Sequence, residues 1–548
     1  MHTSLSRRRL LGAGAASLIA APALAGCGTS QVRSASNVGA DPVPWPEHIP
    51  FDGPEPDLPP DPRGVDAGFL RYPDRLTTSV PEKPGTGRET VTALVETYEA
   101  PPLGPGSNQY WAALNDALGV DLRLRVVPSG NMGHKIATMM ASGDMPDLML
   151  VRNWMPRVAD YAVNAAQDLS EFLAGDRIRD YPNLANLPTY AWQDMGLMAG
   201  RIQGVPIVRP RTGSTVLANQ EAMSEAAQGR YNDWTGEELV DALVRATGDG
   251  HYGFGSASGG WLFGAPLFAS WFGAPNMYRV DDAGNFVKAE ATEEYRAAIE
   301  FATRLHQDEK VYYPGAATLA TETLKSMFFN GTVRSHVDNL PGYQAAVTAV
   351  RDEFTVDLLR APTGLGRGPV SHFSGGTYGY TLFKPAAPDR IRLLLRVLDF
   401  LAAPFGTTEY ELTYYGVEGA HFTRGDGDLE LTELAQRENP SVVPVKYITA
   451  PPPVHFFPGN PEAARRAHAF QVADVEMGIP PLTSGLVVRE ARVDQNRLRN
   501  VFFDAAVSVI QGHSPISRWD DAVRRWRTDG GDRIDAELQR EYEAVHGS

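Results

Sequence analysis

The 548-residue chain has a single cysteine, Cys27, and fewer basic than acidic residues, 50 Lys and Arg against 66 Asp and Glu. One cysteine excludes an internal disulfide and a thiolate metal cage. The formal charge of −16 argues against a nucleic-acid-binding protein, which needs a basic surface. The hydrophobic content of 43% is that of a folded protein, and the length predicts two or more domain-sized cores.

The sequence also lacks the motifs of the common catalytic and cofactor sites. It contains no H-E-x-x-H, G-x-S-x-G or G-x-x-x-x-G-K-[ST], and the glycine-rich segment 253–260 does not have the spacing of a dinucleotide site. The segment 281–285 lacks the alternating acids of a calcium loop and predicts a tight turn between strands at 278–280 and 286–288. We therefore expect no cofactor, no metal and a binding protein rather than an enzyme. The paired carboxylates of a glycan-degrading enzyme have no sequence signature, so that alternative stays open.

Residues 1–26 have the layout of a signal peptide. Three arginines at 7–9 precede an apolar run at 10–25, which is shorter than the about 20 apolar residues of a membrane span. Residues 6–11 resemble a twin-arginine export signal, and Leu24-Ala25-Gly26-Cys27 resembles a bacterial lipobox, in which the cysteine is diacylated. The resemblance implies an exported protein held on the extracytoplasmic face of the cell membrane by the lipid on Cys27. The alternative is an ordinary signal peptide followed by a buried cysteine.

Residues 27–88 are rich in proline, which disfavours helix and promotes extended conformations. One interpretation is a tether that holds the folded body away from the membrane. The other is a strap packed on the surface of the body, for which apolar side chains are available: Phe51, Phe69, Leu70 and Tyr72. The sequence does not decide between the two.

From residue 89 onward, strand and helix patterns alternate. Strands are predicted at 89–98, 120–127 and 146–151, with a helix capped by Ser107 after the first and another helix after the second. This order implies a parallel sheet covered by helices. Ligands bind at the carboxyl ends of such strands, which places Arg152-Asn153-Trp154 at the edge of a candidate site. Apolar stripes predict later helices, among them one capped by Thr292.

Four motifs occur in the order of a known family. They are A-S-G-D-M-P-D at 141–147, G-V-P at 204–206, Y-G-V-E-G-A-H-F at 415–422 and W-R-T-D-G-G-D-R-I-D-A-E at 526–537. Together they resemble the extracellular solute-binding proteins of bacterial ABC importers, in the lipoprotein branch that handles oligosaccharides. The resemblance extends from about residue 90 to residue 542.

The resemblance implies an α/β fold of the periplasmic-binding-protein type II, with two discontinuous lobes and a ligand cleft between them. The first lobe is expected at 89–210 and the second at 211–360, while 361–548 supplies the return crossing and the C-terminal helices that complete both lobes. The chain would pass to the second lobe near 205–219 and return near 361–383. The implied partners are an oligosaccharide and the transmembrane permease subunits of the importer, and we expect a monomer that binds no nucleic acid.

A sugar presents hydroxyl groups and flat C–H faces, so its site needs planar hydrogen-bonding side chains and aromatic rings. Residues of these types follow predicted strands, crossings or family motifs, and we take them as candidate ligand-binding residues: Asn153, Trp154, Arg209, Arg211, Trp261, Asp338, Asn339, Tyr378, Glu418 and His421.

Six of these candidates also have a structural interpretation. The two tryptophans can fill the cores of the lobes, the two arginines can form ion pairs between lobes, and Glu418 and His421 can hold a loop in place. The arginines suggest an acidic group such as a uronic acid, because guanidinium pairs bidentately with carboxylate, but arginine also bonds neutral hydroxyls, so a neutral sugar stays open. The rivals of a sugar receptor are a glycan-degrading enzyme and an envelope interaction protein on the same fold.

Replacement of Cys27 by serine tests the lipid anchor. The Cys27→Ser variant should be released into the culture medium, because two or three acyl chains anchor a protein stably and the variant would carry none. The measurement is the distribution of the protein between the medium and the membrane fraction, with the unchanged chain as the control. A variant that persists in the membrane fraction would refute the anchor.

Overall fold

The computed structural model describes residues 33–98, 102–153, 155, 157–258, 262–350, 353–425, 428–438, 443–487 and 489–546. The predicted signal peptide, the lipidation site at Cys27 and the candidate ligand residues Trp154 and Trp261 lie outside these ranges. Within them, no helix combines the length and the apolar character that crossing a bilayer requires.

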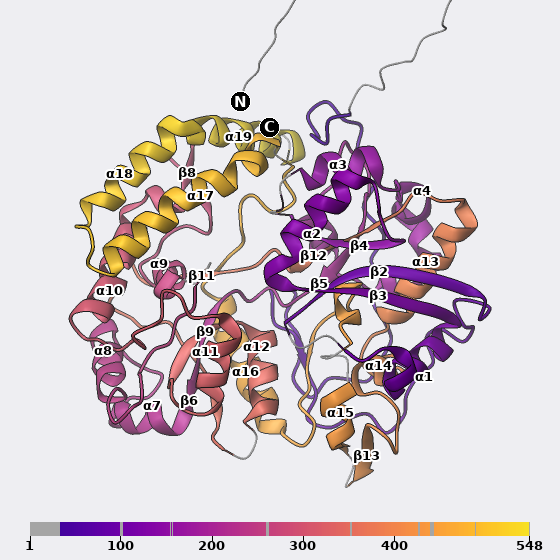
Figure 1. The fold of residues 1–548 in the computed structure, drawn as a ribbon, viewed down its shortest axis with the longest axis horizontal. Coiled ribbons are helices and arrows are strands. Elements are labelled where there is room, and N and C mark those ends of the chain that lie inside the picture. The colour runs from indigo at the N-terminus through magenta and orange to yellow at the C-terminus, as the bar shows by residue number, and fades with distance from the viewer. Residues whose placement is uncertain are drawn as a thin grey trace, which may run out of the picture. The chain divides into compact units, whose positions relative to one another are not determined.

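The first lobe is built on a five-stranded sheet (Figure 1). Its strands follow the order β3 (Val120–Pro128), β2 (Glu89–Thr97), β4 (Leu148–Val151), β12 (Thr377–Phe383) and β5 (Val205–Val208). β2 pairs in parallel with β3 and β4, which confirms the prediction for these three strands. β12 is antiparallel to both β4 and β5, so the sheet is mixed rather than wholly parallel.

Helices such as α1 present apolar faces to this sheet, as the buried Trp111, Leu114 and Leu118 illustrate. The α1 helix begins after Asn108, whose Oδ1 accepts a hydrogen bond from the Trp111 amide at 2.8 Å. The prediction that Ser107 is the cap is wrong by one residue, because Ser107 ends the preceding 3-10 turn η1 (Pro105–Ser107). The helices are α1 (Gln109–Leu118), α2 (Ser129–Ser142), α3 (Val158–Ala165), α4 (Ser170–Leu173), α5 (Pro182–Ala185), α6 (Thr189–Met195), α13 (Pro388–Leu401), α14 (Thr408–Tyr415) and α15 (Glu433–Glu438).

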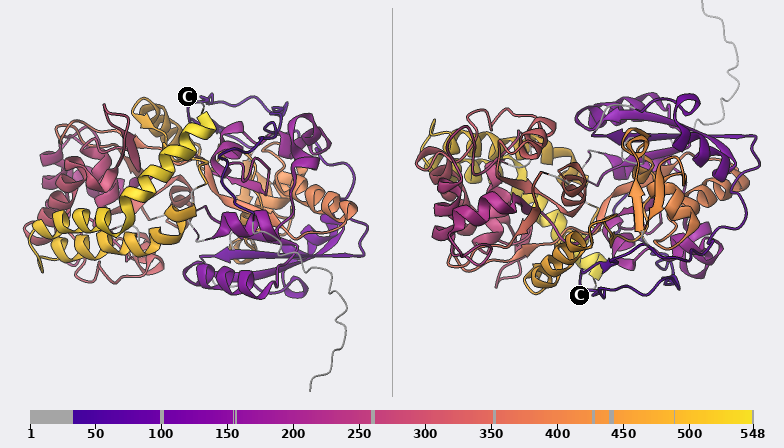
Figure 2. Two further views of the ribbon diagram at one scale, coloured as in Figure 1. Left: turned by 90° about the horizontal axis from the view of Figure 1, so that it is seen from above. Right: turned by 90° about the horizontal axis from the view of Figure 1, so that it is seen from below.

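The second lobe has a three-stranded antiparallel sheet with the order β10 (Val356–Leu359), β6 (Thr215–Asn219) and β9 (Ser335–Asp338). Aromatic rings are prominent in its core, where Tyr295 and Trp519 stack with their planes 2° apart. The C-terminal helices α17, α18 and α19 pack together (Figure 2). The helices are α7 (Gln220–Ala227), α8 (Gly236–Arg245), α9 (Ala265–Trp271), α10 (Glu293–Gln307), α11 (Thr321–Phe329), α12 (Leu340–Ala349), α16 (Pro461–Val475), α17 (Arg489–Ile510), α18 (Ser517–Trp526) and α19 (Asp532–His546).

Two local predictions in the second lobe are confirmed. The side chain of Thr292 caps α10 by accepting from the amide of Tyr295. The segment 281–285 joins the antiparallel strands β7 (Tyr278–Val280) and β8 (Phe286–Lys288). Its first residue, Asp281, accepts from two amides of the same turn through Oδ1, so this carboxylate stabilises the hairpin.

The described chain passes between the lobes at several places, of which three bear on the site and on the segment before it. Residues 209–214 lead from β5 to β6, and residues 360–376 lead back from β10 to β12. At the third crossing, Phe456 packs in an aromatic cluster on the first lobe, whereas Phe457 packs against Tyr343 of the second. We call these three crossings the hinge.

Short contacts join neighbouring hinge segments. The Ser374 amide donates to the Arg211 carbonyl at 2.8 Å, which links the first crossing to the second. The short strand β11 (Ser371–His372) in the second crossing pairs in parallel with β16 (Gly478–Ile479), which follows α16. The hinge is therefore a bonded assembly of several segments.

Residues 34–88, which we call the strap, pack on the body as part of one compact unit that begins at Ser34. The strap strand β1 (Ala67–Gly68) pairs in parallel with β15 (Val454–His455). Phe69 and Tyr72 are buried, and their rings lie 4.3 and 5.3 Å from the ring of Phe405. Of the two interpretations of this segment, the structure shows the packed one for the described residues.

Asp399, on α13, is a buried carboxylate of the first lobe. Its Oδ1 accepts from the amides of Asn183 and Leu184 at 2.8 and 3.0 Å, yet burial raises its pKa to about 7. An acid whose pKa is higher in the folded than in the unfolded state binds its proton more tightly when folded. Its contribution to folding stability therefore becomes less favourable as the pH rises from about 4 towards 7.

The Asp399→Asn variant should lose this pH dependence, because the amide keeps an oxygen acceptor without a buried charge. Chemical denaturation at about pH 5 and about pH 7 measures it: the free energy of unfolding should fall less between the two in the variant than in the wild type. Asp389→Asn, a change to an exposed acid of the same helix, is the control. If the free energy of unfolding falls equally between the two pH values in the wild type and in Asp399→Asn, the raised pKa of Asp399 would be contradicted.

Candidate functional site

Side chains from four strands and one turn meet at the carboxyl edge of the first-lobe sheet. Tyr98 follows β2, Arg152 follows β4 and Arg209 follows β5, while Tyr378 lies near the start of the antiparallel β12 and so reaches the same edge. Tyr447, in the 3-10 turn η5 (Val445–Tyr447), completes the group. We call these five residues the tyrosine–arginine cluster.

Rings and guanidinium groups are in contact throughout the cluster. The Tyr447 ring lies 4.8 Å from the Tyr378 ring and 6.3 Å from the Tyr98 ring, measured between centroids. The Arg152 guanidinium carbon lies 4.2 Å from the Tyr378 centroid, and that of Arg209 lies 5.0 Å from it. These distances are those of cation–π pairs, which hold each flat group against the next.

A buried acid anchors one side of the cluster. Glu96, on β2, is fully buried and forms an ion pair with Arg152, and the Tyr378 hydroxyl donates to the same Glu96 oxygen. Burial raises the pKa of Tyr378 well above its usual range, so this phenol stays a neutral donor. Glu96 thus fixes the side chains of Arg152 and Tyr378. These two side chains lose their conformational entropy when the protein folds rather than when it binds a ligand.

Arg209 differs from Arg152 in its partners. Its guanidinium donates to the carbonyl oxygens of Val208 and Lys446, at 2.8 and 3.5 Å, and the second contact is long. Among the described residues it forms no ion pair with a carboxylate, so the interlobe ion pair weighed for it is not found there. The Arg209 side chain is half-buried, and it combines a positive charge with donor capacity at the sheet edge.

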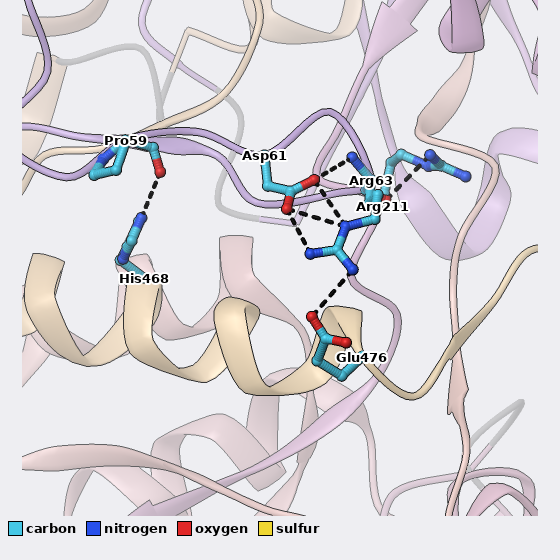
Figure 3. Close-up of polar contacts among 6 residues, drawn as sticks. All are labelled: Pro59, Asp61, Arg63, Arg211, His468 and Glu476. Carbon is cyan, nitrogen blue, oxygen red and sulfur yellow. Dashed lines mark hydrogen bonds and ion pairs between the residues drawn. The ribbon is translucent and has the colours of Figure 1, made fainter.

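Arg211 lies against the strap. Its Nη1 donates to the carbonyl oxygen of Arg63 at 3.2 Å (Figure 3), and its guanidinium stacks over Tyr190 and Phe373. No contact with the five cluster residues is found for it in the described part of the chain. The structure thus separates two arginines that the sequence presents as a pair.

Asn153 lies beside the cluster, where it joins the end of β4 to α6. Its Nδ2 donates to the Asp194 carbonyl oxygen at 3.1 Å, while its Oδ1 is buried without a hydrogen-bond partner among the described residues. The Asp194 carboxylate in turn accepts from the hydroxyls of Thr377 and Ser484. A Cβ at Gly375 would overlap that carboxylate, so this close approach requires glycine.

Asp338 and Asn339 lie at the carboxyl end of β9 in the second lobe. Asp338 is buried and pairs with Lys325 at 3.2 Å. Asn339 caps α12 by accepting from the Gly342 amide at 3.0 Å. Both side chains therefore already have local partners.

The family motif at 415–422 forms a packed loop. His421 is fully buried, its Nδ1 accepts from the Val417 amide at 3.1 Å, and its Nε2 lies 3.5 Å from a Glu438 oxygen. Glu418 is half-exposed and lies 3.5 Å from Arg424. These contacts hold the loop in place, which is the structural interpretation weighed for both residues.

Sequence analysis missed three residues of the site region: Glu96, Tyr98 and Tyr447. The rule that ligands bind at strand ends gives a usable signal for Tyr98, because it closes the predicted strand 89–98. Tyr447 has no local signal, since it comes from a short turn distant in the chain. No group of three or more His, Cys, Asp or Glu side chains suited to a metal occurs in the described ranges.

Comparisons with known proteins agree with this architecture. Residues 100–404 match the model of the bacterial extracellular solute-binding protein family. Lipoprotein LipO of Bacillus subtilis is 22% identical over 463 residues, 79% of this chain and 88% of that protein. The polygalacturonan/rhamnogalacturonan-binding protein YtcQ of Bacillus subtilis is 20% identical over 439 residues, 77% of this chain and 85% of that protein.

A solved structure shows the same fold. The HMO-binding, ABC-transporter-associated solute-binding protein of Bifidobacterium longum infantis superimposes with a TM-score of 0.61 at 12% identity. The alignment covers 84% of this chain and 99% of that protein. The predicted two-lobed α/β fold is confirmed.

Removal of the Glu96 carboxylate should destabilise the first lobe strongly. In Glu96→Ala the Arg152 guanidinium keeps its buried position without the carboxylate that balances its charge there, a change that costs about 3 to 5 kcal/mol of unfolding free energy. Asp144→Ala removes the partner of Arg125 in an exposed pair of the same lobe and should cost less than about 1 kcal/mol. Denaturant unfolding of both variants measures the difference, and similar small losses would show that Glu96 does not anchor the cluster.

Proposed function

The chain belongs to the family of bacterial extracellular solute-binding proteins, and from that premise we propose that it captures an oligosaccharide for an ABC importer. In this proposal the protein is anchored through a lipid on Cys27, binds the sugar between its lobes and delivers it to the permease. The observation that carries the sugar assignment is the tyrosine–arginine cluster at the carboxyl edge of the first-lobe sheet.

The chemistry of the cluster suits a carbohydrate. The exposed ring of Tyr98 and the half-buried ring of Tyr378 can stack on the C–H faces of sugar rings, the buried Tyr447 ring supports them, and the guanidinium groups can donate to hydroxyl oxygens. A micromolar dissociation constant corresponds to about −8 kcal/mol. A few stacked rings and several hydrogen bonds to charged groups supply that much after ordering costs, which are reduced here because Glu96 fixes part of the cluster.

We further propose that the sugar carries a carboxylate, as a uronic acid does. Arg209 has no carboxylate partner in the described ranges, and guanidinium pairs more strongly with an anion than with a neutral hydroxyl. One relative is named for binding polygalacturonan and rhamnogalacturonan, which contain such acids. The acidic group would lie at Arg209 rather than at Arg152, whose charge Glu96 already balances.

Ligand capture would bring the two lobes together. A sugar held by the cluster on the first lobe gains further contacts when the second lobe reaches it, and residues at the end of β9, such as Asp338 and Asn339, are candidates for those contacts. Closure is then a shift of the population from the open to the closed form. Its free energy comes from the contacts that the ligand makes only in the closed form.

Binding measurements on Arg209 variants test the proposal. Oligogalacturonides should bind with saturable heat by calorimetry and should raise the unfolding free energy by about 2.7 kcal/mol at 100 times the dissociation constant. Arg209→Ala should weaken this binding by about 10-fold or more, because a charge-assisted pair is lost, and should change the binding of neutral galactose oligomers less. Arg177→Ala, on the exposed surface of the same lobe, is the matched control.

The possible results separate the parts of the proposal. Equal affinity for acidic and neutral oligomers, with no effect of Arg209→Ala, would exclude the acidic ligand while leaving a sugar receptor. If no oligosaccharide of a broad panel gives heat of binding or raises the unfolding free energy, the sugar receptor would be excluded and an envelope interaction protein favoured. Shortened products in the same mixtures would show a glycan-degrading enzyme instead.

A further inference from the structure

The strap makes contacts on both lobes and on the hinge, and we propose that it acts as a clamp that restrains the movement of one lobe relative to the other. This role is separate from ligand binding and does not depend on which sugar, if any, the protein takes. It rests on contacts that fix the strap to the first lobe, to the second-lobe helices α16 and α19, and to the crossings between the lobes.

Both flanks of the strap are bonded to the first lobe. Before its middle section, the amides of Val43 and Ile49 donate to the carbonyls of Gly200 and Ala185, each at 2.9 Å. After it, the amide of Val80 donates to the Glu409 carboxylate at 2.8 Å. The buried Phe69 and Tyr72 add apolar contact on the same lobe. The strap is thus held on the first lobe on either side of the residues that reach away from it.

The middle of the strap is bonded to α16, which packs in the core of the second lobe. The imidazole Nε2 of His468 lies 2.8 Å from the Pro59 carbonyl oxygen, and Arg63 bridges Asp61 on the strap and Glu476 after the helix (Figure 3). In the same contact, the Asp66 backbone amide donates to the side-chain Oε1 of Gln471. The side-chain Nε2 of Gln471 donates in turn to Asp66 Oδ2, and both distances are 2.8 Å.

The same section of the strap also contacts two of the hinge crossings. The Arg63 carbonyl oxygen accepts from Arg211 Nη1, in the first crossing, at 3.2 Å. Val65 forms a small buried cluster with Phe373, in the second crossing, and with Val475, at the end of α16. Any rotation of the second lobe about these crossings must move α16 relative to the first lobe, and it therefore strains or breaks the contacts of Val65 and Asp66.

A second contact of the strap also spans the lobes. The side chain of Asn37 donates to the Leu197 carbonyl at 2.8 Å and accepts from the Gly200 amide at 2.9 Å, both on the first lobe. Its backbone amide donates to Glu541 on α19 at 3.3 Å, and α19 packs in the second-lobe core. The strap therefore joins the lobes near both its beginning and its middle.

The strength of the clamp is not distributed evenly. The Arg63–Glu476 pair is more than half exposed on both sides, and such pairs contribute at most about 1 kcal/mol. The reciprocal Asp66–Gln471 bonds and the buried Val65 cluster are shielded from water, where an unmade hydrogen bond or a lost methyl contact costs more. Asp66 and Val65 are thus expected to carry more of the restraint than Arg63.

Distances between spin labels on the two lobes test the clamp without any ligand. Because Cys27 is the only cysteine, its replacement by serine leaves a chain in which Ala112→Cys on α1 and Ala345→Cys on α12, both exposed, can be labelled selectively. In pulsed dipolar spectroscopy, Asp66→Ala should widen the distribution of distances between the labels. Asn37→Ala combined with Asp66→Ala should widen it further, and Arg63→Ala should widen it less than Asp66→Ala.

Glu55→Ala, a change to an exposed acid of the strap, is the matched control and should leave the distribution unchanged. Thermal unfolding of each variant checks that both lobes stay folded. If Asp66→Ala is not folded, Val65→Ala removes two methyl groups from the Phe373 cluster and makes the same test. A distribution in Asn37→Ala/Asp66→Ala and Val65→Ala that matches the parent chain in mean and width would refute the clamp, whatever the outcome of the sugar-binding experiments.

Discussion

The antiparallel pairing of β12 with β4 and β5 is the constraint on which the site depends. β12 is the strand by which the chain returns to the first lobe. It lies in the sheet between β4 and β5, which both precede it by more than a hundred residues in the chain. Because it runs against them, its beginning meets their carboxyl ends. Tyr378 is thereby placed between Arg152 and Arg209, and its hydroxyl reaches Glu96.

The same pairing makes the crossings between the lobes part of the site. The segment that leads to β12 is bonded to the segment that follows β5, and the cluster begins where these two segments enter the sheet. The ligand proposed for the cluster would therefore lie beside the hinge, where a small rotation of the second lobe would change the residues that it contacts. The strap packs on this hinge through Val65 and is bonded to α16 through Asp66. The contacts of the strap and those of the proposed ligand would therefore both affect the rotation of one lobe relative to the other.

Charge is arranged unequally around the cluster. A fully buried carboxylate balances Arg152, which makes that arginine part of the framework, whereas Arg209 has neutral oxygen partners in the described ranges. This asymmetry is the physical basis for proposing an acidic sugar. Two arginines close in sequence, Arg209 and Arg211, also differ in their contacts: the first stacks on the tyrosines and the second bonds to the strap.

The sequence by itself determined the local elements of this protein. Strands at 89–98 and 120–127, the hairpin around 281–285 and the Thr292 cap follow from periodicity and from residue types that act over a few positions, and the structure confirms them. Family motifs indicate the two-lobed fold, and two of the candidate ligand-binding residues, Arg209 and Tyr378, are brought together by the structure. The cap assigned to Ser107 was wrong because neighbouring residues compete for the same helix end.

Only the tertiary structure decided how distant segments meet. Local sequence patterns carry no information on pairings between residues far apart in the chain. Three features of the cluster depend on such pairings: the place of β12 in the sheet, the burial of Glu96 against Arg152 and the contact of Tyr447 with Tyr378. Whether the proline-rich segment is free or packed was likewise open, because proline favours an extended backbone in either case. Its position is set by apolar side chains such as Phe69 and Val65 and by bonds to α16, which exist only once both lobes are folded.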